Sequence, residues 1–362
     1  MATLKNTTFQ STDNIKLPVG NTAQRSGSPV AGMIRYNTAM SLIEFYDGSG
    51  WRPVTGYSQG TVGTGGQSIV YRDGYVIHLF TNTGSHTFTP AHTGTVQVLV
   101  VAGGGSGGSH HGGGGGGGGV SYNRSFPVST GSAISLNVGA GAPRPGFPSR
   151  GNNGSNSNFG PLSATGGGGG GSWDTDQGQP GGSGGGGTSG SSNRTRYEGG
   201  LGISNQGFPG GSGIRFNVQG DNNHAAGGGG GAGGKGKEGS EHRYDGYTAD
   251  GGPGIANDIT GQTLYFGGGG GAAHHHAQAG IAPTGGIGGG GGGMVYHGVP
   301  VQPSTQYYGV GGGMALNAGG NATSTSNAGE GGTNTGGGGG GVSYQYAGTG
   351  SAGGPGIVVL RY

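Results

Sequence analysis

Histidine, aromatic and arginine side chains gather in short segments between runs of glycine, and these residue types could do chemistry. Imidazoles bind metals and carry protons, and aromatic rings beside polar groups suit stacking against sugar rings. Loops on a rigid scaffold are where binding residues usually lie. We interpret the set as recognition loops; alternatively its tyrosines and histidines only cap the glycine runs. The candidates are His110, His111, Trp173, Arg194, Arg196, Tyr197, His242, Tyr244, Tyr247, His274, His275, His276, Tyr296, His297, Tyr307 and Tyr308.

Metal and catalytic chemistry have weaker support in the spacing. No carboxylate or cysteine stands at ligand spacing beside residues 274–276, so we expect no metal and no other cofactor. Joint ligation of a metal by residues 110–111 and 274–276 is the alternative. A hydrolytic carboxylate pair needs a separation of about 5–9 Å across a cleft, and nothing in the sequence frames Asp174 and Asp176 in that way. We therefore expect no enzyme, with glycan hydrolysis as the alternative.

The composition excludes several classes of protein. The 362 residues include 104 glycines but only 16 prolines, and the glycines come in solid runs, which excludes collagen. Charged residues make up 8% and the net charge is +2, too few for a charge-driven disordered tail and too weakly basic for a nucleic-acid partner. Hydrophobic residues, at 29%, cannot build a conventional core of this size.

Targeting signals are not apparent in the sequence. The first residues lack the apolar segment of a secretory signal peptide, and no stretch of about 18 apolar residues occurs. We expect synthesis in a cytoplasm and release by another route, such as within an assembled particle.

Residues 1–55 have an ordinary composition and differ from the rest. Strands are expected within 33–37 and 42–48, with Trp51 covering the hairpin. Because such an element is too small to be stable alone, we expect neighbouring subunits to complete its core. Residues 56–66 read as a linker. Residues 67–111 read as a β-rich neck and frame, with a hairpin turn at Asp73-Gly74.

Residues 112–362 contain most of the glycine. The two most apolar strands, 96–101 and 356–362, bracket it, and we expect them to pair in one sheet. No helical period is sustained, so we predict a mainly β fold with almost no α-helix. The glycine runs are 112–119, 166–171, 184–187, 227–231, 267–271, 288–293 and 336–341.

Such runs are typical of flexible linkers, but an ordered alternative exists. A polyglycine II helix has three residues per turn, a rise of about 3.1 Å and no internal hydrogen bonds. Without Cβ atoms, neighbouring helices approach closely and bond to one another. These bonds offset the entropy that glycine loses on ordering. We predict a sandwich of polyglycine II helices over 112–362, closed by the strand 356–362.

The segment "LPVGNTAQRSGSPVAGMIRYNTAMSLIEFYDGSGW" resembles the N-terminal module of bacteriophage tail fibres and other virion appendages, especially in cyanophages. "TGTVQVLVVAGGG", "TNTGGGGGG" and "GGPGIVVLRY" are similar to the glycine-rich fibre domain of the same phages. The resemblance implies a virion protein, a homotrimeric fibre or adhesin. It would bind other tail or capsid proteins through its N-terminal module, and a host polysaccharide or outer-membrane protein through its loops. A capsid or tail decoration protein without a receptor is the main alternative, and an extracellular filament or surface protein of a cell is the third.

Overall fold

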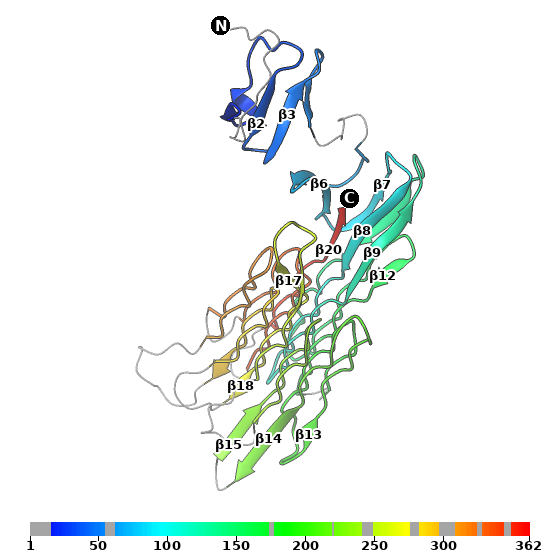
Figure 1. Ribbon diagram of the computed structural model, residues 1–362. Coiled ribbons are helices and arrows are strands. Elements are labelled where there is room, and N and C mark those ends of the chain that lie inside the picture. Colours follow the sequence, from blue (N-terminus) through cyan, green and yellow to red (C-terminus); the bar gives the residue numbers. More distant parts are fainter. Residues whose placement is uncertain are drawn as a thin grey trace. The chain divides into compact units, whose positions relative to one another are not determined.

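The structure is a computed structural model that describes residues 16–54, 62–173, 177–218, 221–240, 249–275, 282–296, 308–323, 328–343 and 349–362 (Figure 1). Within these ranges the chain is mainly β, and a single turn of 3₁₀ helix, Thr22–Gln24, is the helical structure present. The expected fold class, mainly β with almost no helix, is therefore confirmed. The described residues contain no helix with the length and hydrophobicity needed to cross a membrane.

The chain divides into two compact units. The N-terminal unit comprises Met1–Val62 and Val70–Val76, and the glycine-rich unit comprises Gly63–Ile69 and Ile77–Tyr362. The N-terminal unit contains a four-stranded sheet, and its central antiparallel pair is the hairpin that the sequence predicts. Its strands are β1 (Val19–Gly20), β2 (Ile34–Asn37), β3 (Leu42–Tyr46) and β4 (Trp51–Pro53), in that order.

One face of this sheet buries polar side chains. Glu44 is 1% exposed and accepts hydrogen bonds from Arg25 Nε at 3.1 Å and from Asn37 Nδ2 at 3.2 Å. Arg35 lies 3.6 Å from the same carboxylate and under the ring of Trp51. Burial opposes the ionisation of Glu44, but the hydrogen bonds and the two arginine charges outweigh it and hold its pKa below the usual range.

The opposite face of the same sheet is apolar and exposed. Strand alternation places Ile34 and Ile43 on it, and Val19 and Val54 extend it at the neighbouring strands. These four side chains are 39–62% exposed. The sheet thus buries its charges and exposes its apolar residues, which reverses the usual arrangement of a half-buried sheet.

Two facing sheets, which we call the frame, lie mainly in the glycine-rich unit, although Val70–Val76 of β5 and β6 are counted with the N-terminal unit. The expected pairing of 96–101 with 356–362 is confirmed, since β8 and β20 run antiparallel with Val101 opposite Ile357. Buried Phe80, Phe88 and Phe159 pack in the core between the sheets. The strand order in the first sheet is β5 (Ser68–Arg72), β6 (Tyr75–Phe80), β20 (Ile357–Arg361), β8 (Gly94–Val101) and β9 (Val120–Val128). The order in the second sheet is β12 (Leu162–Ala164), β11 (Ser157–Phe159), β10 (Ile134–Val138) and β7 (Gly84–Phe88).

Glycines shape the start of the frame at a hairpin turn and in a closely packed segment. Asp73 and Gly74 both have positive φ, 51° and 81°, as the predicted two-residue hairpin turn requires. Part of the expected linker 56–66 is instead packed. Thr64 bridges to Thr89, and a Cβ on Gly65 would lie 2.4 Å from the carbonyl oxygen of Thr87. Residues 63–66 therefore belong to the frame, while 55–61 lie outside the described residues.

The remaining strands lie farther along the glycine-rich unit. A five-stranded sheet is visible at the end of the unit away from the frame (Figure 1). Its order is β13 (Arg196–Tyr197), β14 (Gly213–Val218), β15 (Asp221–Ala225), β18 (His274–His275) and β19 (Val295–Tyr296). A separate hairpin pairs β16 (Ile255–Asn257) with β17 (Leu264–Phe266).

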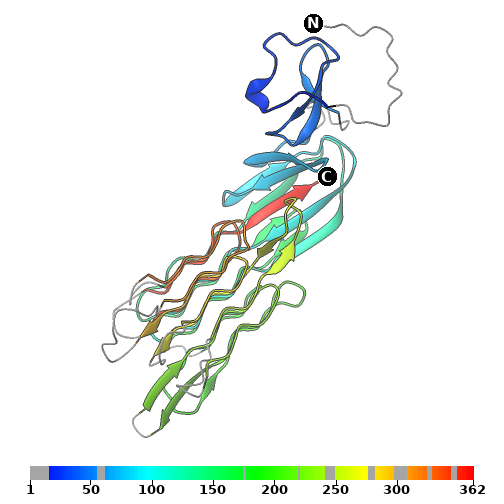
Figure 2. The ribbon, with the colours of Figure 1, turned by 60° about the vertical axis from the view of Figure 1, so that its left-hand side comes forward.

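Between these sheets the glycine runs lie side by side and bond laterally through their backbones (Figures 1 and 2). In run 112–119, every third N–H donates to the same neighbouring segment, over 2.7–3.1 Å. The donor–acceptor pairs are Gly112–Val342, Gly115–Gly339, Gly118–Gly336; Gly113–Gly171, Gly116–Gly168, Gly119–Thr165; and Gly114–Gly227, Gly117–Gly230. Its carbonyls accept, with the same period, from three further segments, 102–108, 183–186 and 270–273.

This run therefore has six bonded neighbours, and its bonding repeats every three residues. A three-residue period is what a polyglycine II helix predicts. Every glycine of run 112–119 also has φ outside the left-handed region. The linker alternative is wrong for this run, because its backbone groups are bonded to other segments. The polyglycine II conformation of the runs stays a prediction.

Close approach explains why these neighbours are glycines. A Cβ on Gly115 would lie 2.2 Å from the carbonyl oxygen of Gly105, and one on Gly116 would lie 2.2 Å from that of Ser183. Real Cβ atoms do not approach backbone oxygens so closely, so any side chain would push two bonded segments apart. The solid runs thus follow from the packing of the array, the name we use for these laterally bonded segments.

Gly338→Ala tests this packing. Its Cβ would lie 2.0 Å from the carbonyl oxygen of Gly115, so we expect the free energy of unfolding to fall by about 3 kcal/mol or more. Gly146→Ala is the matched control, because Gly146 has open space around it and its φ is not positive. Urea denaturation measures both; equal effects at the two positions would contradict the array.

The frame also predicts a pH dependence. His78 is fully buried, with Nδ1 2.7 Å from the carbonyl oxygen of Gly65 and Nε2 3.0 Å from the hydroxyl of Tyr362. Burial, partly opposed by the bond to Gly65, lowers the pKa of His78 from its ordinary 6.5. Below about pH 6.5 the unfolded chain therefore binds more protons than the folded chain. Stability should fall as the pH drops through about 6.5 and level off below the folded pKa.

Denaturation midpoints between about pH 8 and pH 4 measure this dependence for the native chain and for His78→Gln. The glutamine variant should lose the component of the slope that begins near the ordinary histidine pKa. An unchanged slope would show that His78 does not titrate differently on folding.

Candidate functional site

Sequence-predicted residues meet at the end of the glycine-rich unit away from the frame, which we call the loop end. It comprises the sheet β13–β14–β15–β18–β19, which Figure 1 shows, together with residues 109–111, Trp173 and 188–197, which contact that sheet or lead into it. His110 and His111 occupy the turn between two array segments, and both have positive φ, 55° and 57°. The chain reverses there, which places both residues at the end of the bonded segments.

Four rings form a cluster at this turn. The ring of Trp173 stacks on His110 with 5.5 Å between centroids, and it lies 5.2 Å from both His111 and His224. His111 and His224 stack at 4.3 Å. The guanidinium carbon of Arg215 lies 5.6 Å from the centre of the Trp173 ring, an attractive cation–π arrangement. The cluster therefore combines stacked rings with a positive charge.

Hydrogen bonds fix the cluster to the backbone. The backbone N–H of Trp173 donates to the backbone carbonyl of His110 at 3.2 Å, and the Thr188 hydroxyl donates to the backbone carbonyl of His111 at 2.8 Å. His224 Nδ1 lies 3.3 Å from the Ser189 hydroxyl. The backbone that carries three of the rings is thus fixed, and the ring of His224 is fixed by its own contact, so the cluster is preorganised.

Burial divides the cluster into an inner and an outer part. His111 and His224 are 4% and 3% exposed, whereas His110 and Trp173 are half-buried. Phe147, which is 41% exposed, lies beside His110 with 5.4 Å between ring centroids. The buried imidazoles of His111 and His224 fit the alternative in which histidines only cap the glycine runs. The half-buried rings of His110 and Trp173 are accessible to a ligand.

A second group lies on β13 and the turn before it. Arg194 is exposed, with its guanidinium 5.4 Å from the Phe216 ring centre, and Arg196 forms an ion pair of 3.1 Å with Glu238. The hydroxyl of half-buried Tyr197 accepts a bond from the Ser192 N–H at 3.0 Å. Arg194 thus gives the loop end an exposed positive charge, whereas the charge of Arg196 is paired with that of Glu238.

The structure gives fewer contacts for the remaining predicted residues. His274 is buried, with Nε2 2.9 Å from Asn223 Oδ1, and Tyr308 is 37% exposed. His275 and Tyr296 are described only by their strands, β18 and β19. Outside the described residues lie His242, Tyr244, Tyr247, His276, His297 and Tyr307.

Sequence reasoning missed His224, Phe147 and Arg215. His224 had a signal, because it precedes a glycine run in "NNHAAGGGG" much as His110 and His111 do in "SHHGGGG". Phe147 and Arg215 had none, since their contacts depend on which segments become neighbours. Among the described residues, no three His, Asp or Glu side chains are grouped so that they could hold a metal ion.

The comparison with known protein families matches residues 81–302 to a family described as a glycine-rich domain. The match covers more than half of the 362 residues, so the chain belongs to this glycine-rich domain family. No curated protein matches the sequence.

Trp173→Ala tests whether the ring cluster closes this end of the array. Removing the indole takes away contacts to His110, His111 and His224, so we expect amide hydrogen exchange near residues 109–112 to accelerate by about tenfold or more. Exchange within 115–118 should change little. Phe208→Ala is the control, an aromatic side chain that is 44% exposed elsewhere. Equal acceleration in both variants would contradict a closing role.

Proposed function

We propose that this chain is an adhesin-type component of a bacteriophage virion, a tail fibre that displays loops to the host surface. The observation that carries the proposal is the gathering of aromatic and arginine side chains at the loop end of a backbone-bonded array. A rigid scaffold lowers the entropy that its loops lose on binding. The phage assignment rests on the sequence resemblance, since the family match speaks only for a glycine-rich domain.

Each of the two units has its own proposed partners. The loop end would bind a host polysaccharide or outer-membrane protein through several weak contacts, made strong by many copies on one particle. The N-terminal unit would attach to other virion proteins and to further copies in a homotrimer. Its exposed apolar face, with Ile34 and Ile43 at the centre, supports an assembly role because such patches mark protein contacts.

A capsid or tail decoration protein is the second candidate. The same apolar face supports it, because any stable attachment to a particle would cover that surface. It differs from the adhesin in that the loop end would have no receptor. In either case the protein would be made in the host cytoplasm and carried outside the cell in the released virion.

Adsorption to host cells tests the proposal. Labelled full-length chain should bind saturably to cells of the phage-sensitive strain and block infection. Arg194→Asn with Arg196→Gln should weaken adsorption at least about tenfold, because both guanidinium groups are exposed hydrogen-bond donors at the loop end. Lys235→Ser, which removes an exposed charge outside the loop end, is the control. Failure to adsorb, with antibody labelling of capsid or tail shaft, would favour decoration.

A further inference from the structure

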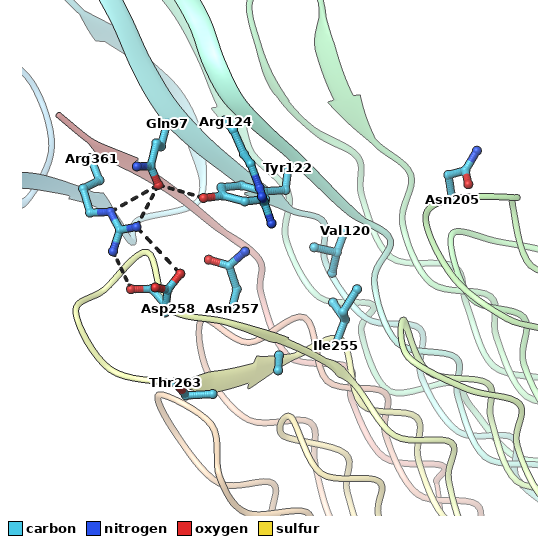
Figure 3. A pocket seen from close by; sticks show the side chains of 11 residues that line it. Gln97, Val120, Tyr122, Arg124, Asn205, Ile255, Asn257, Asp258, Thr263 and Arg361 are labelled. Carbon is cyan, nitrogen blue, oxygen red and sulfur yellow. Dashed lines mark hydrogen bonds and ion pairs between the residues drawn. The ribbon is translucent and has the colours of Figure 1, made fainter.

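A cleft of about 740 Å³ opens on the solvent face of the frame, beside the β16–β17 hairpin (Figure 3). Its lining comes from strands β8, β9 and β20, the hairpin and Asn205. This volume falls within the range typical of small-molecule sites. None of the lining residues is among the sequence-predicted candidates, and the cleft lies away from the loop end.

Hydrogen bonds fix one wall of the cleft. Arg361 donates to Gln97 Oε1 from Nη2 at 2.8 Å and from Nε at 3.2 Å, and the Tyr122 hydroxyl donates to the same oxygen at 2.7 Å. Arg361 Nη1 also donates to the carbonyl of Asp258 at 2.8 Å, which ties the hairpin to the frame. Figure 3 shows these side chains converging on one side of the cleft. The wall is therefore preorganised.

The charges of the cleft do not balance. Arg361 lies 3.7 Å from the Asp258 carboxylate, so that pair is neutral. Arg124 is exposed with its guanidinium carbon 5.9 Å from the Tyr122 ring centre, and no carboxylate of the described residues pairs with it. One positive charge is left at the cleft. Guanidinium groups bind carboxylates through two parallel hydrogen bonds.

The rest of the lining is mixed. Tyr122 and Ile255 supply apolar surface, and Ile255 is 43% exposed. Asn257 and Thr263 supply an amide and a hydroxyl. An apolar patch with hydroxyl-binding groups and one cation matches a sugar ring that carries a carboxylate. A lipid chain would need a more apolar lining, and a phosphate ester would need more positive charge.

We propose that this cleft binds an acidic sugar unit, a uronate residue of a surface polysaccharide. The ring would lie against Tyr122 and Ile255, its hydroxyls would bond to Asn257 and Thr263, and its carboxylate would pair with Arg124. The inference names the receptor class of the proposed function and rests on it to that extent. It also gives the fibre a binding site outside the loop end.

Isothermal titration of the full chain with tetragalacturonate tests the proposal, with neutral maltotetraose for comparison. We expect saturable binding of the uronate and at least about tenfold weaker binding of the neutral sugar. Arg124→Gln should weaken uronate binding by a similar factor. Arg150→Gln is the matched control, because Arg150 is also exposed but does not line the cleft. Circular dichroism spectra of both variants would confirm that they fold.

Three results would overturn the assignment: no uronate binding, equal binding of both sugars, or equal weakening by Arg124→Gln and Arg150→Gln. Cell adsorption separates this inference from the proposed function. Uronate binding by a chain that does not adsorb to cells would support the cleft and contradict the adhesin. Undiminished adsorption of Arg124→Gln, with uronate binding lost, would support the adhesin and overturn the cleft as the receptor site.

Discussion

Lateral hydrogen bonding between bare backbones is the interaction on which the rest of this structure depends. Run 112–119 donates to three neighbours and accepts from three others, with a period of three residues. Each bond contributes about 0.5–1.5 kcal/mol net, comparable with the extra entropy that each glycine loses on ordering. The balance is favourable only when nearly every group is bonded. The array must therefore form as one cooperative unit, and it can do so without an apolar core of its own.

The frame supplies what bare backbone cannot, a fixed register. Strand β8 continues directly into segment 102–109, and run 112–119 continues directly into β9. After Ala102 the chain passes from bonding two neighbours in a sheet to bonding several segments around it. Glycine runs have no side chains to distinguish one register from another. Pairing of β8 with β20 inside a core of Phe80, Phe88 and Phe159 therefore fixes where the first and last segments begin.

The sequence predicts the strands and turns that have characteristic side chains. It does not predict which glycine runs become neighbours, because that depends on backbone contacts alone. Apolar strands 96–101 and 356–362 and the Asp73-Gly74 turn were predictable because their residues carry the pattern. Which run lies beside which was not, since any glycine run fits any other. The contact of His111 with His224 and the meeting of Tyr122, Asp258 and Arg361 were therefore invisible beforehand. Ordinary patterning also puts apolar residues inside, so the buried Glu44 and exposed Ile34 were not expected.

The same steric rule decides where this molecule can do chemistry. A side chain needs a Cβ, and inside the array a Cβ meets a carbonyl oxygen at about 2 Å, as it would at Gly338. Large side chains are therefore confined to the ends of segments and to the outer surface. His110 and His111 stand at a chain reversal, and Tyr122 stands where a run has become a strand. Changes at such positions leave the interior bonds untouched. A backbone-bonded array thus separates the part that must stay glycine from the parts that are free to acquire a ligand.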